Sequence, residues 1–122
     1  MEWTVRSDQP IYAQLVEQLR LAIVSGGYVP GARLSSVRDM ATEAGVNPNT
    51  LQRALQELER MELVFSQRTA GRFVTEDTAL IAREKNALAA ERAAAFLRAM
   101  EQLGLGREEI ISLLRENKED AV

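Results

Sequence analysis

Two helix-start signals follow each other closely in the middle of the chain, and this arrangement constrains the fold more than any other feature. Ser36 and Asp39 have the spacing of a capping box. In the second signal, Asn47 is a capping residue, and Pro48 after it suits the first turn of a helix. Gly45 lies between the signals and ends the first helix early. Two short helices joined by a tight turn containing glycine predict a helix-turn-helix.

The segments on either side of this helix pair predict a winged helix. Before it, Asp8-Gln9-Pro10 marks the start of a helix, with the aspartate as its cap, and Gly26-Gly27 marks its end. After it, the β-compatible stretches Leu63–Gln67 and Arg72–Thr75 predict a hairpin. We therefore expect a winged helix-turn-helix over residues 1–75.

The composition changes after Thr75. Residues 79–103 are rich in alanine, glutamate and arginine and contain neither glycine nor proline, which predicts one long helix capped at Asp77 or Thr78. The stretch Gly104-Leu105-Gly106 is expected to break this helix.

A shorter helix is expected at residues 107–117, followed by a frayed tail over Lys118–Val122. Residues 76–122 thus predict an α-helical hairpin. The expected fold class is mainly α with a small β-hairpin, a winged helix-turn-helix followed by this helical hairpin.

A seam of apolar residues runs along the long helix at coiled-coil spacing, on a surface that is otherwise charged. The short helix that follows cannot cover so long a seam, whereas a second copy of the chain can, which predicts a homodimer. The alternative is that the helical hairpin folds back onto its own winged helix. The residues expected in the dimer interface are Ile81, Leu88, Ala89, Ala93, Phe96, Met100, Leu103, Ile110 and Leu114.

Cysteine and histidine are both absent from the 122 residues. This absence excludes disulfides, thiol nucleophiles, zinc sites and imidazole bases. We therefore expect no catalytic residues, no metal, no cofactor and no enzymatic activity. The start of the chain lacks the pattern of a signal peptide, and no stretch approaches about 20 consecutive apolar residues. The sequence thus predicts a soluble cytoplasmic protein without a membrane partner.

The net charge of −3 is unevenly distributed. Residues 1–75 hold eight arginines and eight acidic residues, whereas residues 76–122 hold seven basic and ten acidic residues. The basic residues of the first part are all arginines, whose planar guanidinium suits phosphate groups and guanine edges. This pattern is compatible with DNA binding, with chance codon usage as the alternative.

The outer face of the second helix of the helix-turn-helix carries Asn49, Gln52, Arg53 and Gln56, opposite its apolar stripe. Amide and guanidinium groups form paired hydrogen bonds with base edges, and the N-terminal half of this helix enters the DNA groove in this motif. That half contains no carboxylate. We interpret it as a DNA-reading surface. The alternatives are a solvated face, or a winged helix that binds proteins, although protein hot spots favour aromatic residues that this face lacks.

Three further arginines are candidates for contacts with DNA. Arg38, early in the preceding helix, is placed to touch phosphate, with a salt bridge to Asp39 or Glu43 as the alternative. Arg68 and Arg72 flank the tip of the expected hairpin, where a wing reaches the minor groove.

An ordered series of short motifs runs through the first part of the chain: Pro10-Ile11-Tyr12-x-Gln14-Leu15, Gly27-Tyr28-x-Pro30-Gly31, Leu34-x-Ser36-x-Arg38, Val46-Asn47-Pro48-Asn49-Thr50-Leu51-x-x-Ala54, Leu58-Glu59 and Gly71-x-Phe73-Val74. This series resembles the GntR family of bacterial regulators. The resemblance implies a DNA-binding regulator of transcription. The candidate DNA-binding residues are then Ser36, Arg38, Asn47, Asn49, Thr50, Gln52, Arg53, Gln56, Arg68, Gly71 and Arg72.

The remaining region is too short for the ligand domains of most of that family. It is similar to the YtrA subgroup, whose tail is two helices used for dimerisation, and Leu103 to Ile111 matches that subgroup's loop and last helix. The resemblance implies a homodimer on an inverted-repeat operator in double-stranded DNA. It also implies repression, in most cases of genes near a transporter operon. A small-molecule effector is left open.

The chain departs from the family pattern at several positions. Pro48 and Gln52 stand where members have arginines that contact DNA, so the base preference should differ. Glu62 replaces the usual glycine at the end of the reading helix, and a left-handed glutamate costs about 1 kcal/mol, so this helix is expected to end differently. Thr69 replaces a wing glycine.

Overall fold

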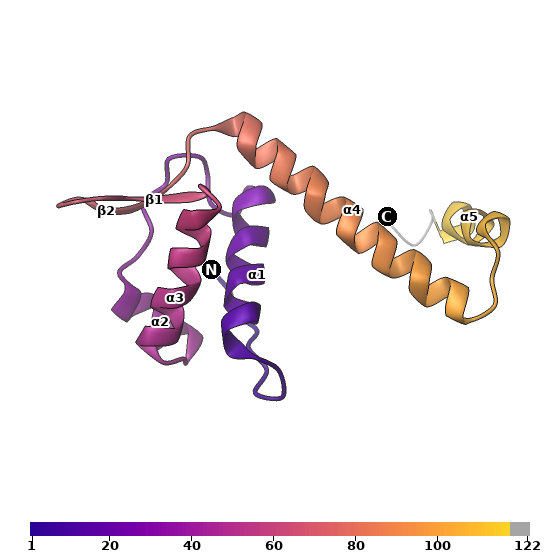
Figure 1. Cartoon of the computed structure of the whole chain (residues 1–122), viewed down its shortest axis with the longest axis horizontal. Coiled ribbons are helices and arrows are strands. Elements are labelled where there is room, and N and C mark those ends of the chain that lie inside the picture. Colours follow the sequence, from indigo (N-terminus) through magenta and orange to yellow (C-terminus); the bar gives the residue numbers. More distant parts are fainter. Residues whose placement is uncertain (118–122) are drawn as a thin grey trace. The chain divides into compact units, whose positions relative to one another are not determined.

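The computed structural model describes residues 1–117 (Figure 1). It contains helices α1 (Ile11–Val24), α2 (Val37–Ala44) and α3 (Pro48–Arg60), strands β1 (Val64–Gln67) and β2 (Gly71–Val74), and helices α4 (Thr78–Gln102) and α5 (Arg107–Glu116). The chain divides into a first compact unit over Met1–Lys85 and a second that begins at Asn86, with α4 running through the boundary. The fold class predicted from the sequence is confirmed.

Both helices of the helix-turn-helix begin where the sequence predicted, although only the serine half of the capping box is observed at α2. Ser36 is the N-cap of α2, and its hydroxyl accepts a hydrogen bond from the N–H of Asp39 at 3.1 Å. Asn47 caps α3 by accepting from the N–H of Asn49 at 2.8 Å, and Pro48 is the first helical residue. Gly45 ends α2 with a φ of 69°, a conformation that costs glycine little.

Helix α1 begins differently from the prediction. Its N-cap is Pro10, so the expected cap at Asp8 is wrong. The Asp8 carboxylate accepts a hydrogen bond from Arg6 instead, at 2.7 Å. The side-chain amide of Gln14 reaches back to the entering segment, where it accepts from the N–H of Arg6 and donates to its carbonyl, each at 2.7 Å. A glutamine inside the helix therefore fixes the chain that enters it.

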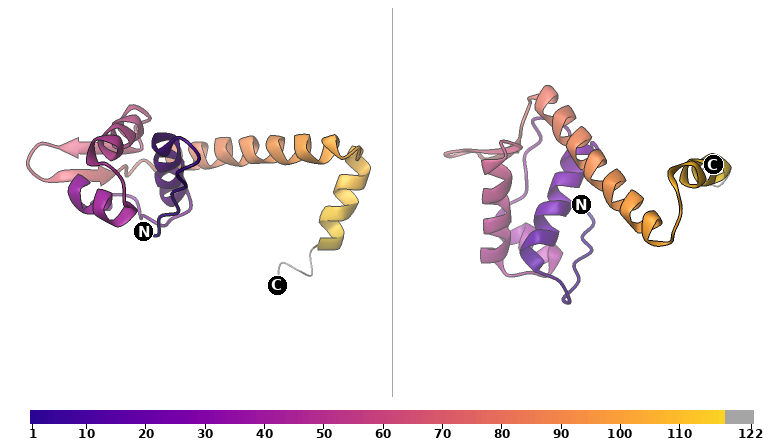
Figure 2. Two further views of the ribbon diagram at one scale, coloured as in Figure 1. Left: turned by 90° about the horizontal axis from the view of Figure 1, so that it is seen from below. Right: turned by 45° about the vertical axis from the view of Figure 1, so that its right-hand side comes forward.

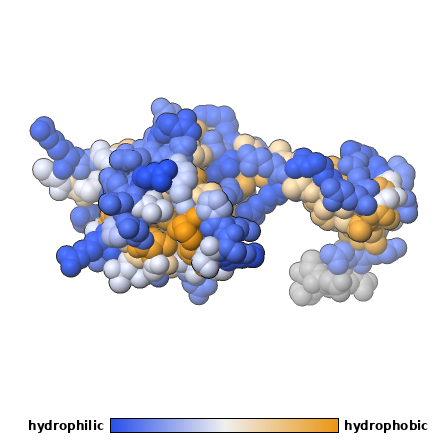
Figure 3. Space-filling model, turned by 60° about the horizontal axis from the view of Figure 1, so that its bottom comes forward, coloured by the Kyte–Doolittle hydropathy of each residue, from blue (hydrophilic) through white to orange (hydrophobic). Residues whose placement is uncertain are grey.

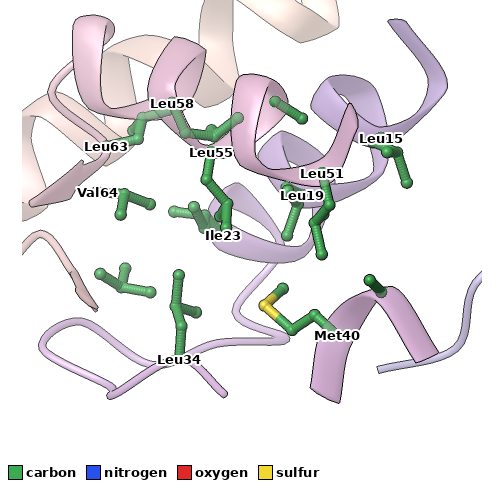
Figure 4. Close-up of a cluster of buried hydrophobic side chains, with 13 residues drawn as sticks. Leu15, Leu19, Ile23, Leu34, Met40, Leu51, Leu55, Leu58, Leu63 and Val64 are labelled. Atoms are coloured by element: carbon green, nitrogen blue, oxygen red, sulfur yellow. The ribbon is translucent and has the colours of Figure 1, made fainter. Parts of the chain in front are cut away.

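The core of the first unit lies between α1 and α3 and continues under the hairpin (Figure 4). Each large apolar side chain buried there contributes about 1.5–3 kcal/mol. Because α3 turns its whole apolar side inward, its polar side faces away from the core. The buried core side chains of these elements include Leu15, Leu19, Ile23, Leu51, Ala54, Leu55, Leu58, Leu63, Val64 and Val74.

Strands β1 and β2 form an antiparallel hairpin in which Val64 lies opposite Val74. The hairpin projects from the helices as a wing in the views of Figures 1 and 2. A third segment pairs with the other edge of β2, where Leu34 N–H donates to the Arg72 carbonyl at 2.9 Å and Val74 N–H donates to the Ala32 carbonyl at 2.8 Å. No pattern in the sequence predicts this pairing, because so short a contact leaves no alternation of apolar and polar residues.

Helix α3 ends in a Schellman motif with a glutamate in the left-handed position. Glu62 has a φ of 64°, and its N–H donates to the Glu59 carbonyl at 2.9 Å. The next N–H, that of Leu63, donates to the Leu58 carbonyl at 3.0 Å. The expectation that the helix would end in another way was therefore wrong. Leu63 is fully buried, and its packing holds Glu62 in this conformation.

The helices that follow the wing also begin with hydrogen bonds between a side chain and the backbone. Asp77 accepts a hydrogen bond from Leu80 N–H at 3.0 Å at the start of α4, in agreement with the predicted cap. At the start of α5, Gly106 N–H donates to the Glu109 carboxylate at 3.0 Å. The predicted fraying of Lys118–Val122 lies outside the described residues. Within the part that the structure describes, no helix is long and apolar enough to cross a membrane.

Candidate nucleic-acid interface

The outward side of α3 presents the polar residues that the sequence indicated. Asn49, Arg53 and Gln56 are exposed, and Gln52 is half-buried. The helix N-terminus adds the positive end of the helix dipole, which favours negative partners. This end of α3 is therefore suited to contact with a phosphate group or an acceptor edge of a base.

Arg53 is supported from beneath by an aromatic ring of another helix. Its guanidinium carbon lies 4.7 Å from the ring centre of Tyr12, on α1. Such a cation–π contact contributes about 0.5–1 kcal/mol at an exposed site and restricts the side chain. Because the partner is a ring and not a carboxylate, the contact leaves the positive charge of Arg53 available to an anion. No signal in the sequence indicated this role of Tyr12.

The start of α2 offers a second positive group beside α3. Arg38 is exposed, and the salt bridges to Asp39 or Glu43 that the sequence left open are not observed among residues 1–117. Ser36 is exposed, and its hydroxyl accepts the hydrogen bond that caps α2. Thr50 is half-buried in the first turn of α3.

Two exposed arginines lie at the wing, Arg68 in its turn and Arg33 beside it, and the second was not among the predicted residues. Arg68 is exposed in the turn between the strands, as expected. Gly71 has a φ of 106°, and a Cβ at this position would lie 3.3 Å from Nε of Arg33. Glycine at position 71 thus lets the exposed Arg33 guanidinium lie close against the hairpin. The sequence signal for Arg33 is weak, because the residue lies in a stretch without helical or strand periodicity.

Arg72 turns toward α3. Its Nε donates to Oε1 of Glu59 at 2.8 Å, and Nη1 donates to Oε1 of Gln52 at 3.1 Å. Burial disfavours the charged form of Glu59, but hydrogen bonds from Ser66 and Arg72, with the charge of Arg72, outweigh it and lower the pKa of this carboxyl. Two residues predicted to bind DNA, Arg72 and Gln52, are therefore bonded to each other. A direct contact of Arg72 with DNA stays a prediction.

The other carboxylate near this face is also paired. Glu57 accepts a hydrogen bond from Nε of Arg60 at 2.6 Å, and this bond lowers the pKa of Glu57. With Glu59 held by Arg72, both acidic side chains have a cationic partner. Their negative charge is therefore offset locally, and the N-terminal half of α3 keeps a field that favours an anionic partner.

The residues predicted to form a dimer interface divide into buried and exposed ones. Leu88 and Ile110 are buried, and Ile81 packs against the core of the first unit. Apolar surface stays open on the second unit (Figure 3), where Phe96 is 40% exposed and Leu103 is 73% exposed. The other predicted positions are exposed or half-buried: Ala89, Ala93, Met100 and Leu114. A contact of these residues with a second copy stays a prediction.

Known proteins share both the sequence pattern and the fold. Residues 11–74 match the family described as bacterial regulatory proteins, gntR family. YhcF of Bacillus subtilis (strain 168), described as an uncharacterized HTH-type transcriptional regulator, is 37% identical over 111 residues, which cover 91% of this chain and 92% of YhcF.

Two further proteins extend this similarity. The HTH-type transcriptional repressor YtrA of Bacillus subtilis (strain 168) is 39% identical over 72 residues, covering 59% of this chain and 55% of YtrA. A GntR family transcriptional regulator from Listeria monocytogenes has a solved structure with a TM-score of 0.85 and 38% identity, covering 91% of this chain and 97% of that one. The likeness to this structure therefore extends beyond the winged helix.

Proposed function

The chain belongs to the GntR family of bacterial regulatory proteins and is a DNA-binding regulator of transcription, and on this premise we propose that it acts as a homodimeric repressor that reads an inverted-repeat operator. Its family and relatives are regulators and not enzymes. In this proposal residues 1–75 bind DNA and residues 76–122 form the dimer, as in the YtrA subgroup that the sequence resembles.

The observation that carries the proposal is the polar face of α3, whose neighbouring acidic side chains are offset by arginines. Asn49, Gln52, Arg53 and Gln56 would read base edges in the major groove. Ser36, Arg38, Asn47 and Thr50 would contact phosphate groups around the same groove. The wing would contribute Arg68 and Gly71, and Arg33 beside them.

The dimer proposal is supported by the apolar surface of the second unit. Phe96 on α4, Leu103 just after it and Leu114 on α5 are large apolar residues, yet they are 40%, 73% and 55% exposed. Exposed apolar patches of this kind are typical of protein interfaces. A two-fold dimer presents two winged helices, and each would read one half of an operator with matching symmetry.

The repressor role is the most specific part of the proposal. It is supported by the name of YtrA, which matches this chain over 59% of its length. We further propose that the protein works in the cytoplasm, where its chromosomal operator would lie. The proposal assigns no small-molecule effector.

Selection of bound sequences from a random DNA pool tests the proposal with the full chain. The expected product is an inverted repeat whose half-sites are related by the two-fold axis of the dimer. Enrichment of single half-sites would contradict the proposal that the protein binds its operator as a dimer. The absence of any enriched sequence would favour a winged helix that binds protein partners, and a gel shift with genomic fragments would check that result independently.

A further inference from the structure

Gln52 of α3 is hydrogen-bonded to the wing by Arg72, a side chain that can only donate hydrogen bonds. The guanidinium of Arg72 contains N–H donors and no acceptor. Its Nη1 lies 3.1 Å from Oε1 of Gln52, and its Nε is fixed at the same time by Glu59 at 2.8 Å. Arg72 is mostly buried, with 19% of its side chain exposed. This part of the wing therefore holds the amide of Gln52 from one side.

The chemistry of Arg72 decides which end of the Gln52 amide faces it. An amide has an acceptor end, Oε1, and a donor end, Nε2, and a free glutamine turns either end outward at little cost. Next to a guanidinium, the turned amide would bring two sets of donors together and lose a charge-assisted hydrogen bond. Oε1 of Gln52 must therefore face Arg72, and the Nε2 amino group is the end left for another partner.

We infer that Arg72 is a specificity-determining positioning residue, because it orients Gln52 as a hydrogen-bond donor toward DNA. This inference rests on the proposed function, in which Gln52 reads a base edge. In the major groove, guanine offers two acceptors and thymine offers one, whereas cytosine offers only a donor. Adenine is read by a glutamine through a pair of bonds that requires both amide ends. The held Gln52 therefore favours guanine or thymine over adenine and cytosine.

The sequence by itself points to the opposite preference. A glutamine on a reading helix suits adenine when its amide is unrestrained. The bond to Arg72 disfavours this option, since it occupies one lone pair of Oε1 and directs the oxygen to the wing. A residue of β2 that need not touch a base would thus change which base α3 selects.

The experiment uses selection from random DNA with the full chain and four variants. Gln52→Ala identifies the base pair that Gln52 reads, because preference there is lost. Arg72→Met removes the guanidinium and keeps an apolar stem of similar reach. Arg72→Lys keeps a positive charge for Glu59, but its single ammonium group cannot span both acceptors as the planar fork does. Arg68→Met is the matched control, an exposed wing arginine.

Competition between oligonucleotides that differ at that base pair gives the size of the effect. We expect the wild type to prefer guanine or thymine there by about fivefold to a hundredfold, the range for a paired side-chain contact with a base edge. Arg72→Met and Arg72→Lys should move the preference to adenine, which the released amide can bind through both of its ends. Arg68→Met should keep the wild-type base. Circular dichroism checks folding, and Arg72→Lys decides the result if Arg72→Met is unfolded.

Different failures are distinguishable. If the wild type enriches an operator and prefers adenine at the Gln52 position, the inference is overturned and the proposed function stands. The same holds if the folded Arg72 variants keep the wild-type base, or if Gln52→Ala changes no position. If the wild type enriches no sequence, the proposed function fails, and the inference fails with it.

Discussion

Helix α3 of the first unit and helix α4, most of which belongs to the second, treat their apolar residues differently. The 13 residues of α3 place Leu51, Ala54, Leu55 and Leu58 in the core, whereas the 25 residues of α4 bury Leu88. The first unit closes its core with its own helices and hairpin. The second leaves an apolar seam open, as expected of a surface that requires another protein surface for burial. A similar helical periodicity thus serves self-contained packing in one region and the proposed association in the other.

The largest effect should follow from breaking the open seam. Phe96→Asp removes about 1.5–3 kcal/mol of apolar burial per copy, and a two-fold interface contains the residue twice. It also places an unpaired charge at the contact, which costs more. We expect sedimentation to give a monomer and operator affinity to fall steeply, because the two half-sites are no longer bound by one tethered pair.

Phe65 supplies the matched control for this variant. It is 38% exposed, against 40% for Phe96, but lies on the wing, where its ring stacks on Phe73 at 5.8 Å. Phe65→Asp should leave the oligomeric state unchanged. A wild-type chain that sediments as a monomer at micromolar concentration would refute the dimer.

The next effect concerns the closed core. Leu55 is fully buried between α1 and α3, and Leu55→Ala should lower the free energy of unfolding by about 2–5 kcal/mol, measured by urea denaturation. Leu103, exposed at 73%, is the counterpart from the second unit. Leu103→Ala should change the stability of the first unit by less than about 0.5 kcal/mol. Equal losses of unfolding free energy from both variants would contradict the difference between a closed core in the first unit and an open seam in the second.

A smaller effect is expected on DNA binding. Arg38→Ala should weaken affinity for all sequences alike and reduce the slope of affinity against salt concentration by about one counterion. Arg53→Ala should cost about 1–3 kcal/mol and relax the preference at particular base pairs. Arg98→Ala, which removes an exposed arginine of the second unit, is the control in the same binding assay. Unchanged affinity in both first-unit variants would contradict the assigned surface.

The smallest effect should be a gain in the free energy of unfolding. Glu62→Gly places the residue that tolerates a left-handed φ of 64° at the end of α3. Relief of the backbone strain, less the entropy that glycine adds to the unfolded chain, should raise the free energy of unfolding by about 0.5–1 kcal/mol. Thermal denaturation measures the change. A loss of stability would show that the glutamate side chain contributes more than its backbone costs.

Most of the fold could be predicted because its signals are local. The caps Ser36, Asn47 and Asp77, the breaks at glycine, and the period of the apolar residues each involve neighbours within a turn or two of helix. The two wrong predictions were also local. Asp8 resembles a cap but pairs with Arg6, and Glu62 was expected to avoid a conformation that the packing of Leu63 imposes.

The sequence by itself determined the order of the helices and strands, the side of α3 that faces outward, and the family. Only the tertiary structure decided how the outward side chains are held. The ring of Tyr12 under Arg53, the guanidinium of Arg33 beside Gly71, and the bond from Arg72 to Gln52 join residues far apart along the chain. No periodicity encodes such contacts, because each depends on where a different element has been placed by the packing of the core.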